Sequence, residues 1–410
     1  MKFKFSKRQE KCILTTEGYI KFKRNIYVPS NEYAKHILRE KYRSKTFIPL
    51  DIYLGIHKLP FRVTADMALR IAFVGASTSS YGEAQKFFQD AYDIKIGDDR
   101  IREVTDYLGK IVFDDDTQKM EQLTSAYDKK KVRSNKANCL GPNPNENERF
   151  VLYNLMDGGT LNSRDKKDKN GSTYREYKLG MVFKSSDLII KQKISDEGLK
   201  TVEMSLGEKR EYVCYVGKVD EFKKYLLALS IKNGLYDAEE VVVLGDGAPW
   251  IEGIFGAYFD YGTRILDLYH LFENVGSFAH HIIKNSAQRA EWINEVCELL
   301  EAGAWQQVLG LPEVREYKTK KTPDGVCNLH TYITNHKGML NYPEYKRLGY
   351  FVGSGAIEGG IKNVGHKRVK LGGMRWWLDK AQFILSLRAK IKSNLWQTEV
   401  IPLVHKNYTK

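Results

Sequence analysis

Hydrophobic and polar residues follow two different periods in the first part of the chain. In TTEGYIKFKRNIYV, residues 15–28, they alternate one by one, which predicts a strand or a hairpin. Later the apolar positions recur at helical spacing, and residues 79–112 divide into two amphipathic stretches around a short turn. We therefore expect a mainly helical N-terminal domain over residues 1–115.

The two helices expected near 80–112 leave two interpretations open. Two short helices around a tight turn resemble a helix-turn-helix, which is a common DNA-reading unit. The same pattern also fits an ordinary helical hairpin, which is the more frequent structure. Beyond them, residues 116–147 are polar and include Gly141, Pro142 and Pro144, which predicts a linker ahead of the next domain.

From residue 149 the pattern predicts short apolar strands interspersed with helices. The expected order is β-β-β-α-β-α-β, then a long helical stretch, and lastly a helix that carries Glu358. The segments behind this order are RFVLYNLMDGG (149–159), STYREYKLGMVFKSS (172–186), EYVCYVG (211–217), VDEFKKYLLALSIKNG (219–234), EEVVVLGDGAPWI (239–251) and TRILDLYHLFENV (263–275). The run in the fifth segment is apolar without interruption, as in a strand buried on both faces.

This order is that of a ribonuclease-H-like fold, an α/β protein whose mixed sheet is covered by helices on both faces. We expect its catalytic core to comprise residues 148–270 and 346–395. Residues 271–345 would form an all-helical insertion before the last core helix, and residues 396–410 a C-terminal tail.

Composition and charge narrow the class of partner and the compartment. The formal net charge is +14 and the pI about 9.2, which favours a polyanionic partner but also fits a merely soluble basic protein. The five cysteines are scattered without a CxxC pair, which argues against a disulfide framework or a zinc ribbon and fits a reducing compartment. No secretory signal or membrane-spanning run is visible, so we expect a soluble cytoplasmic protein with no membrane contact.

Three acidic residues stand at special places in this predicted fold. Asp157 ends the first core strand and Asp246 ends the fourth, and in ribonuclease-H-like sheets these two strands lie side by side. The late helix would bring Glu358 to the same edge of the sheet. Each acid also has an ordinary explanation, because an Asp after a strand often forms a turn and Glu358 can pair with Lys362 four residues on.

Three convergent carboxylates repel one another unless a cation lies among them. Hard oxygen ligands suit Mg²⁺, and two such ions can stabilise the attacking and leaving oxygens of a phosphoryl transfer. We therefore predict that Asp157, Asp246 and Glu358 hold two Mg²⁺ ions, with Mn²⁺ as a substitute. The glycines beside these acids would let a phosphate backbone approach closely, and they are Gly158, Gly159, Gly245, Gly247, Gly359 and Gly360.

Three separated motifs resemble the DDE transposases of bacterial insertion sequences, in the branch related to Mutator-like elements. They are VVVLGDGAPWI, RILDLYH and GSGAIEGGIKNVGHKRVKLGGMRWW, and the resemblance covers about residues 150–395. It implies that Asp157, Asp246 and Glu358 are the catalytic acids. Many members carry a C/D-x-x-H motif soon after the second acid, and Asp267-Leu-Tyr-His270 fits it, which implies supporting roles for Asp267 and His270.

The resemblance implies metal-dependent cleavage of DNA at element ends, followed by attack of the freed 3′-hydroxyl on target DNA. The partner would be double-stranded DNA, as element ends and as target, and the protein would act as a homo-oligomer. Two alternatives stay open: a ribonuclease-H-like nuclease that cuts without joining, and a catalytically silent DNA-binding protein derived from a transposase.

The segment 359–395 carries nine lysines and arginines against a single acid, Asp379. Basic residues neutralise phosphates, and exposed tryptophans stack on unpaired bases. The predicted DNA-binding residues are Lys362, Lys367, Arg368, Lys370, Arg375 and Trp376. The alternative is that Trp376 and Trp377 belong to the core, which we expect for at least one of them.

Overall fold

The computed structural model describes residues 3–42, 44–56, 61–132, 149–194, 200–353 and 355–409. The chain folds as two compact units, each assembled from separate segments. Unit 1 comprises residues 1–117, 162–173 and 367–410, and unit 2 comprises residues 118–161 and 174–366. Both contain helices and strands, so the chain is an α/β protein, as predicted.

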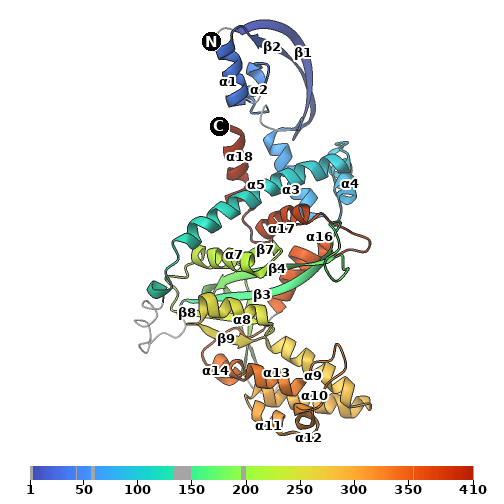
Figure 1. Cartoon of the computed structure of the whole chain (residues 1–410), viewed down its shortest axis with the longest axis vertical. Helices are drawn as coiled ribbons and strands as arrows, with labels where there is room; N and C mark the ends of the chain where they lie inside the picture. The colour runs from blue at the N-terminus through green and yellow to red at the C-terminus, as the bar shows by residue number, and fades with distance from the viewer. Residues whose placement is uncertain are drawn as a thin grey trace. The chain divides into compact units, whose positions relative to one another are not determined.

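Unit 1 begins with a long antiparallel hairpin, β1 and β2 (Figure 1). Its turn joins Thr15 to Gly18, whose φ of +105° favours glycine. The alternating segment predicted as a strand or hairpin forms this turn and β2, which confirms that prediction. The elements of unit 1 are β1 (Phe3–Thr15), β2 (Gly18–Pro29), α1 (Glu32–Tyr42), α2 (Pro49–Tyr53), α3 (Ala65–Ser77), α4 (Tyr81–Tyr92), most of α5 (Asp98–Ser125), α16 (Lys367–Val369), α17 (Leu378–Lys392), the π-helix η7 (Trp396–Val400) and α18 (Ile401–Thr409).

The two helices predicted near 80–112 are present as α4 and α5, but α5 continues to Ser125. The linker predicted from residue 116 is therefore wrong for its first ten residues. Leu108, Val112 and Met120 are all buried at helical spacing, so the apolar face of α5 persists through a polar sequence. Residues 126–132 do not form a solvated linker either, since Val132 is buried in the core of unit 2, and the predicted linker from residue 133 on lies outside the described residues.

The last segment, 367–410, belongs to unit 1, whereas the sequence assigned residues up to 395 to the catalytic core. Helix α17 is buried on all sides from Ala381 to Ala389. Its basic residues are used inside unit 1: Arg388 donates to the carbonyl oxygen of Ala76, and Lys390 pairs with Asp116 at 2.7 Å. A helix buried on all sides shows no amphipathic stripe, so its burial partner cannot be inferred from periodicity.

Unit 2 is built on a five-stranded mixed sheet of order β7-β4-β3-β8-β9. Strand β3 pairs in parallel with β8, and β8 in parallel with β9, whereas β4 and β7 are antiparallel. The first and fourth strands of this unit's main sheet are therefore neighbours, as predicted. These strands are β3 (Val151–Asn162), β4 (Tyr174–Lys184), β7 (Glu211–Val216), β8 (Glu240–Gly245) and β9 (Thr263–Leu266).

Helices cover both faces of this sheet. A side chain at Gly180 of β4 would meet Leu226 of α7 (Val219–Lys232), so even-numbered positions of β4 face α7. Leu179, on the opposite face, lies against α15 (Gly355–Gly360). The predicted coverage of both faces is confirmed. Helix α8 (Pro249–Ile254) shares the buried cluster of α7.

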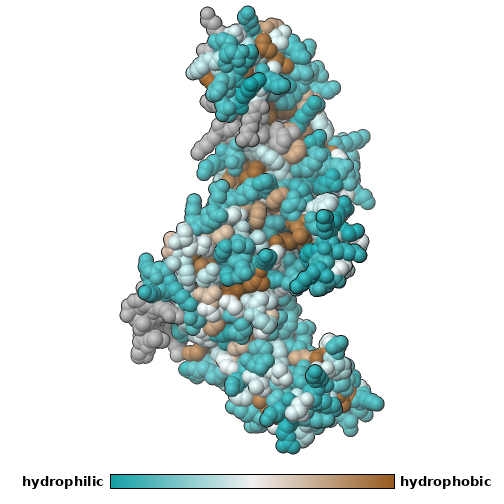
Figure 2. All heavy atoms as spheres, in the orientation of Figure 1, coloured by the Kyte–Doolittle hydropathy of each residue, from teal (hydrophilic) through white to brown (hydrophobic). Residues whose placement is uncertain are grey.

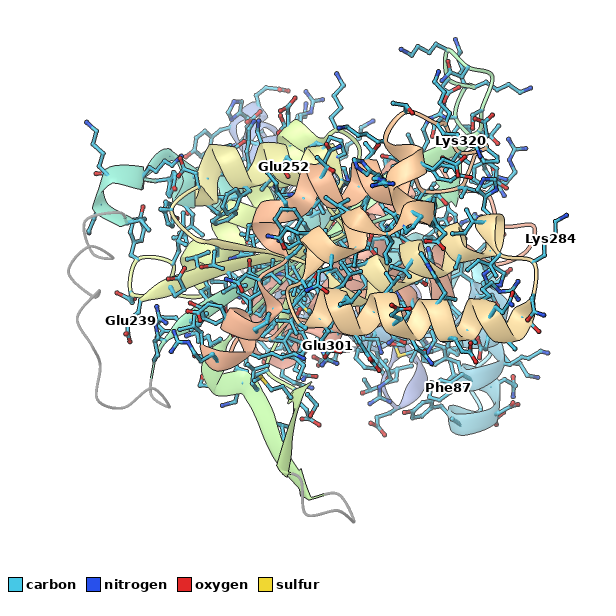
Figure 3. The ribbon with its side chains drawn as sticks, turned by 90° about the horizontal axis from the view of Figure 1, so that it is seen from below. Phe87, Glu239, Glu252, Lys284, Glu301 and Lys320 are labelled. Atoms are coloured by element: carbon cyan, nitrogen blue, oxygen red, sulfur yellow. The ribbon has the colours of Figure 1, made fainter. Side chains whose placement is uncertain are left out.

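Two further parts of unit 2 extend from the sheet. Strands β5 (Leu188–Ile194) and β6 (Lys200–Leu206) form a separate antiparallel ribbon that the sequence did not predict, and Figure 3 shows it projecting outward. The predicted all-helical stretch forms a group beside β9, with Lys284 and Lys320 at its outer edge in Figure 3. Its elements are α9 (Leu268–Ile282), α10 (Ser286–Glu301), α11 (Trp305–Gly310), α12 (Pro312–Arg315), η4 (Glu316–Lys318), α13 (Leu329–His336), η5 (Lys337–Met339) and α14 (Tyr342–Arg347).

No helix in the described part of the chain combines the length and apolar character needed to span a bilayer.

Candidate functional site

Asp157 and Asp246 occupy equivalent positions on the two central strands of unit 2. The last paired residues of β3 and β8 are Leu155 and Leu244, and each acid lies two residues beyond its strand's member of that pair. Asp246 directly follows β8, as predicted. Asp157 does not end β3, because the strand continues to Asn162.

Both acids point toward the face of the sheet that α15 covers. Met156 of β3 and Val243 of β8 belong to the cluster on the α7 face, and consecutive strand residues point to opposite faces. Asp157 and Asp246 therefore lie on the other face, together with the helix that carries Glu358. The fold brings all three predicted acids to one edge and one face of the sheet.

Two residues from the helical group hold the backbone after β8 in place. Tyr332 donates its hydroxyl hydrogen to the carbonyl oxygen of Asp246 (2.8 Å), and Nε2 of His336 lies 3.0 Å from the carbonyl oxygen of Gly247. Gly247 has a φ of +81°, and a Cβ there would lie 2.5 Å from His336 Nε2. No sequence signal relates Tyr332 or His336 to Asp246, because more than eighty residues separate them from it.

Asp267 and His270 lie beside Glu358. Asp267 caps α9, since its Oδ1 accepts a hydrogen bond from Tyr269 N (2.9 Å), and its side chain is 1% exposed. His270 Nε2 is 3.6 Å from Asp267 Oδ2 and 4.0 Å from Glu358 Oε1. Among the described residues, this trio is the one whose ligand atoms all lie within 4.8 Å of one another.

The tightest group of ligand atoms therefore differs from the predicted one. It joins Glu358 to the two residues predicted as supporting, and it leaves out Asp157 and Asp246.

Electrostatic coupling nevertheless extends across the whole set. Burial raises the pKa of Asp157 to about 6, and the negative charges of Asp246 and Glu358 add to this, while a hydrogen bond from Gly158 N (2.6 Å) opposes it. For His270, burial lowers the pKa, but the charges of Asp267 and Asp157 outweigh it and the pKa lies above its usual value. The site is a concentration of negative charge with one partly buried histidine beside it.

The glycines beside these acids serve two different purposes. A Cβ on Gly360 would lie 2.8 Å from the Tyr212 ring, and one on Gly159 would lie 2.2 Å from the Tyr177 ring. At those glycines, and at Gly245 and Gly247, other atoms of the protein already occupy the space that a Cβ would need. Among the described residues, the predicted access for a phosphate backbone therefore fits Gly158 and Gly359, where an added Cβ would meet no atom nearer than about 4 Å.

A cavity of about 630 Å³ opens beside Asp246. Its walls come from the loop after β8, from His270 and Glu273 of α9, and from Tyr332 and His336 of α13. Asp246 and His270 therefore both face space that a ligand can enter.

The donor set fits a hard divalent cation. Carboxylate oxygens are the ligands that Mg²⁺ prefers, and this ion is commonly held by one or two carboxylates, with water and substrate phosphate completing its shell. Asp157, Asp246 and Glu358 supply such oxygens. The pKa of Asp157 is raised first by burial and then by the negative charges of Asp246 and Glu358, and a cation would offset those charges.

The predicted DNA-binding residues fall into two groups. Lys362, in unit 2, and Lys367, Lys370 and Arg375, in unit 1, are exposed. Arg368 and Trp376 are not part of this exposed group, since their exposed fractions are only 1% and 9%.

Arg368 is buried because its guanidinium lies between the rings of Tyr81 (4.4 Å) and Trp376 (5.0 Å). The neighbouring Trp377 is the exposed member of the pair, at 51%. One of the two tryptophans is thus in the core, as expected, but it is the one predicted to bind DNA.

Comparison with known proteins adds no assignment to this geometry: no protein-family model matches the chain, and a search of curated proteins finds no match.

Proposed function

We propose that this chain is a DDE-type DNA transposase with a ribonuclease-H-like core. It cleaves DNA at the ends of a mobile element and joins those ends to target DNA in the bacterial cytoplasm. Asp157, Asp246 and Glu358 are its catalytic acids.

The observation that carries this proposal is the placement of three acids from distant parts of the chain. Asp157 and Asp246 lie at equivalent positions of neighbouring parallel strands, on the face covered by the helix of Glu358. The strand order, in which the third, second, first, fourth and fifth strands follow one another, is also the one that a ribonuclease-H-like core requires.

The same three acids would hold two Mg²⁺ ions, for which Mn²⁺ can substitute. When bound, the metal would polarise the phosphate and stabilise the negative charge of the transition state. His270 Nε2 lies 4.0 Å from Glu358 Oε1, so a protonated His270 would offset part of the negative charge of the site. Asp267 orders the first turn of α9, which presents His270.

The test is a strand-transfer assay with the purified protein, the DNA that flanks its gene, and Mg²⁺ or Mn²⁺. We expect joined products that disappear in Asp246→Asn, whereas Asp237→Asn, an exposed acid of unit 2, retains them. Cleavage without joining would instead identify a nuclease. Binding without cleavage, unchanged by Asp246→Asn, would identify a silent DNA-binding protein.

A further inference from the structure

Unit 1 contains a cavity of about 990 Å³ that is separate from the acidic site of unit 2. It is enclosed by the start of α4, by α5, by Arg164 of the 162–173 segment and by the loop that joins α16 to α17. Every residue that lines it belongs to unit 1.

Four buried polar atoms at this cavity have no hydrogen-bond partner among the described residues. They are the Tyr81 hydroxyl, Asp106 Oδ1, Arg368 Nη2 and Trp376 Nε1. Buried polar atoms in native proteins are almost always satisfied, so a group of four at one cavity needs an explanation. Together they offer N–H donors, an acceptor and a hydroxyl that can act as either.

The charged groups of Arg368 and Asp106 do not neutralise each other by direct contact. Arg368 stacks between Tyr81 and Trp376 and makes one long hydrogen bond, from Nε to the carbonyl oxygen of Gly75 (3.4 Å). No ion pair joins Arg368 to Asp106 in the described part of the chain, although each affects the other's pKa. Burial raises the pKa of Asp106 to about 6, and its Oδ1 has no donor among the described residues.

The rest of the cavity is aromatic and basic. Phe61, Tyr107, Phe383 and the half-exposed Trp377 supply ring faces. Six basic residues and three acidic residues line the cavity. The exposed basic residues at its rim are well placed to contact phosphate. Figure 2 shows an apolar area framed by hydrophilic atoms over α17, whose first turn borders the cavity.

We propose that this cavity binds one unstacked nucleobase of DNA. The base stacks on the aromatic side chains, its hydrogen-bonding edge meets the four unsatisfied polar atoms, and its phosphate lies against the basic rim. Aromatic faces beside a positive groove are how proteins hold unpaired nucleotides, and an enclosed pocket that reads the base edge is how they hold an extruded one. A site for phosphate alone would need neither the carboxylate of Asp106 nor the ring faces.

That the base belongs to DNA rests on the proposed function. The test therefore measures base binding in EDTA, where strand transfer is not required. Three short duplexes of one sequence are compared by fluorescence anisotropy: one with a bulged 2-aminopurine, one with an abasic bulge, and one fully paired. We expect the bulged base to be bound roughly tenfold more tightly than the abasic bulge, with a change in 2-aminopurine fluorescence on stacking.

Two variants and two matched controls assign this difference to the cavity. Trp377→Ala and Asp106→Asn should each remove most of the preference for the base. Tyr53→Ala, an 87% exposed aromatic of α2, and Asp90→Asn, an exposed acid of α4, should retain it. Asp106→Asn keeps the side-chain shape, so it tests the site even where Trp377→Ala folds poorly.

Two results would overturn the proposal. One is equal affinity of the unmodified protein for the base and the abasic bulge. The other is an equal loss of affinity for all three duplexes in the variants, which would make the cavity a phosphate site. A protein that discriminates the bulged base but never joins strands would contradict the proposed function and leave this site intact.

Discussion

At the scale of single residues, ionisation of Asp157 is unfavourable in the folded chain. Its carboxyl group is partly buried and faces two other acids, so its ionised form costs more in the folded chain than in the unfolded one. With a pKa of about 6 against an ordinary 3.8, this cost is at most about 3 kcal/mol at neutral pH. A bound cation would offset part of this cost, so metal binding is expected to increase stability.

Metal should therefore stabilise the protein through Asp157. At pH 7.5 we expect Mg²⁺ to raise the thermal midpoint of the unmodified protein above its value in EDTA. In EDTA, Asp157→Asn should have a higher thermal midpoint than the unmodified protein, and Mg²⁺ should raise that midpoint by less. Differential scanning fluorimetry measures both, with Asp237→Asn as the control. An equal gain from Mg²⁺ in all three proteins would mean that the ion binds elsewhere.

Asp106 should give unit 1 a pH dependence of its own. Its folded-state pKa, about 6, lies above the unfolded value, so the folded state binds more protons between about pH 4 and 6. The contribution of Asp106 to stability is thus greatest below pH 4 and is lost as the pH rises through 6. Asp106→Asn should remove this loss and be the more stable protein at pH 8. Urea unfolding of both proteins at pH 4, 6 and 8 measures it, and parallel profiles would contradict it.

At the scale of elements, the helix of Glu358 depends on packing rather than on helix propensity. It consists of α15, which has only six residues, and the π-helix η6 (Ile361–His366), and it contains four glycines in twelve residues. Two of these glycines let the helix approach the sheet. A Cβ on Gly360 would lie 2.8 Å from Tyr212, and one on Gly365 would lie 2.0 Å from the Tyr177 hydroxyl oxygen.

Alanine substitutions along this helix should therefore have opposite effects. Gly365→Ala and Gly360→Ala overpack the contact with the sheet, and we expect each to cost about 1–3 kcal/mol of unfolding free energy. Gly359→Ala meets no atom within 4 Å and should gain up to about 1 kcal/mol from helix propensity. Chemical denaturation measures all three. A stabilising Gly365→Ala would show that the helix does not pack closely on Tyr177.

How far an element could be predicted depended on whether its pattern was local. Strands β4 and β7 and helix α7 were predicted because their apolar positions repeat with a clear period, and strands β3 and β8 because each is a short apolar run. The second half of α5 was missed because polar residues outnumber the apolar positions that continue its buried face, such as Met120, and the ribbon of β5 and β6 was missed because it lies apart from the sheet. The acids could be located from strand ends, but Tyr332 and His336 could not, because only tertiary packing relates them to Asp246.

At the scale of the whole molecule, net charge overstates the surface available to DNA. Of the basic residues in the segment 359–395, Arg368 and Arg388 are buried, and Lys390 lies between Asp116 and Glu399 at 2.7 Å from each. A count along the sequence cannot separate these from exposed residues such as Lys367 and Lys370. Only the exposed ones can release counterions from DNA.

The salt dependence of DNA binding should make that distinction measurable. Neutralising Lys367 and Lys370 together, as Lys367→Gln and Lys370→Gln, should weaken binding to any duplex and reduce the slope of log affinity against log salt by roughly 2. Lys284→Gln, an exposed lysine of the helical group in unit 2, is the matched control and should leave the slope unchanged. Fluorescence anisotropy at a series of salt concentrations gives each slope. If the variant with both substitutions kept the slope of the unmodified protein, neither Lys367 nor Lys370 would contact phosphate. The exposed basic residues after Glu358 would then be a solvated surface with no part in DNA binding.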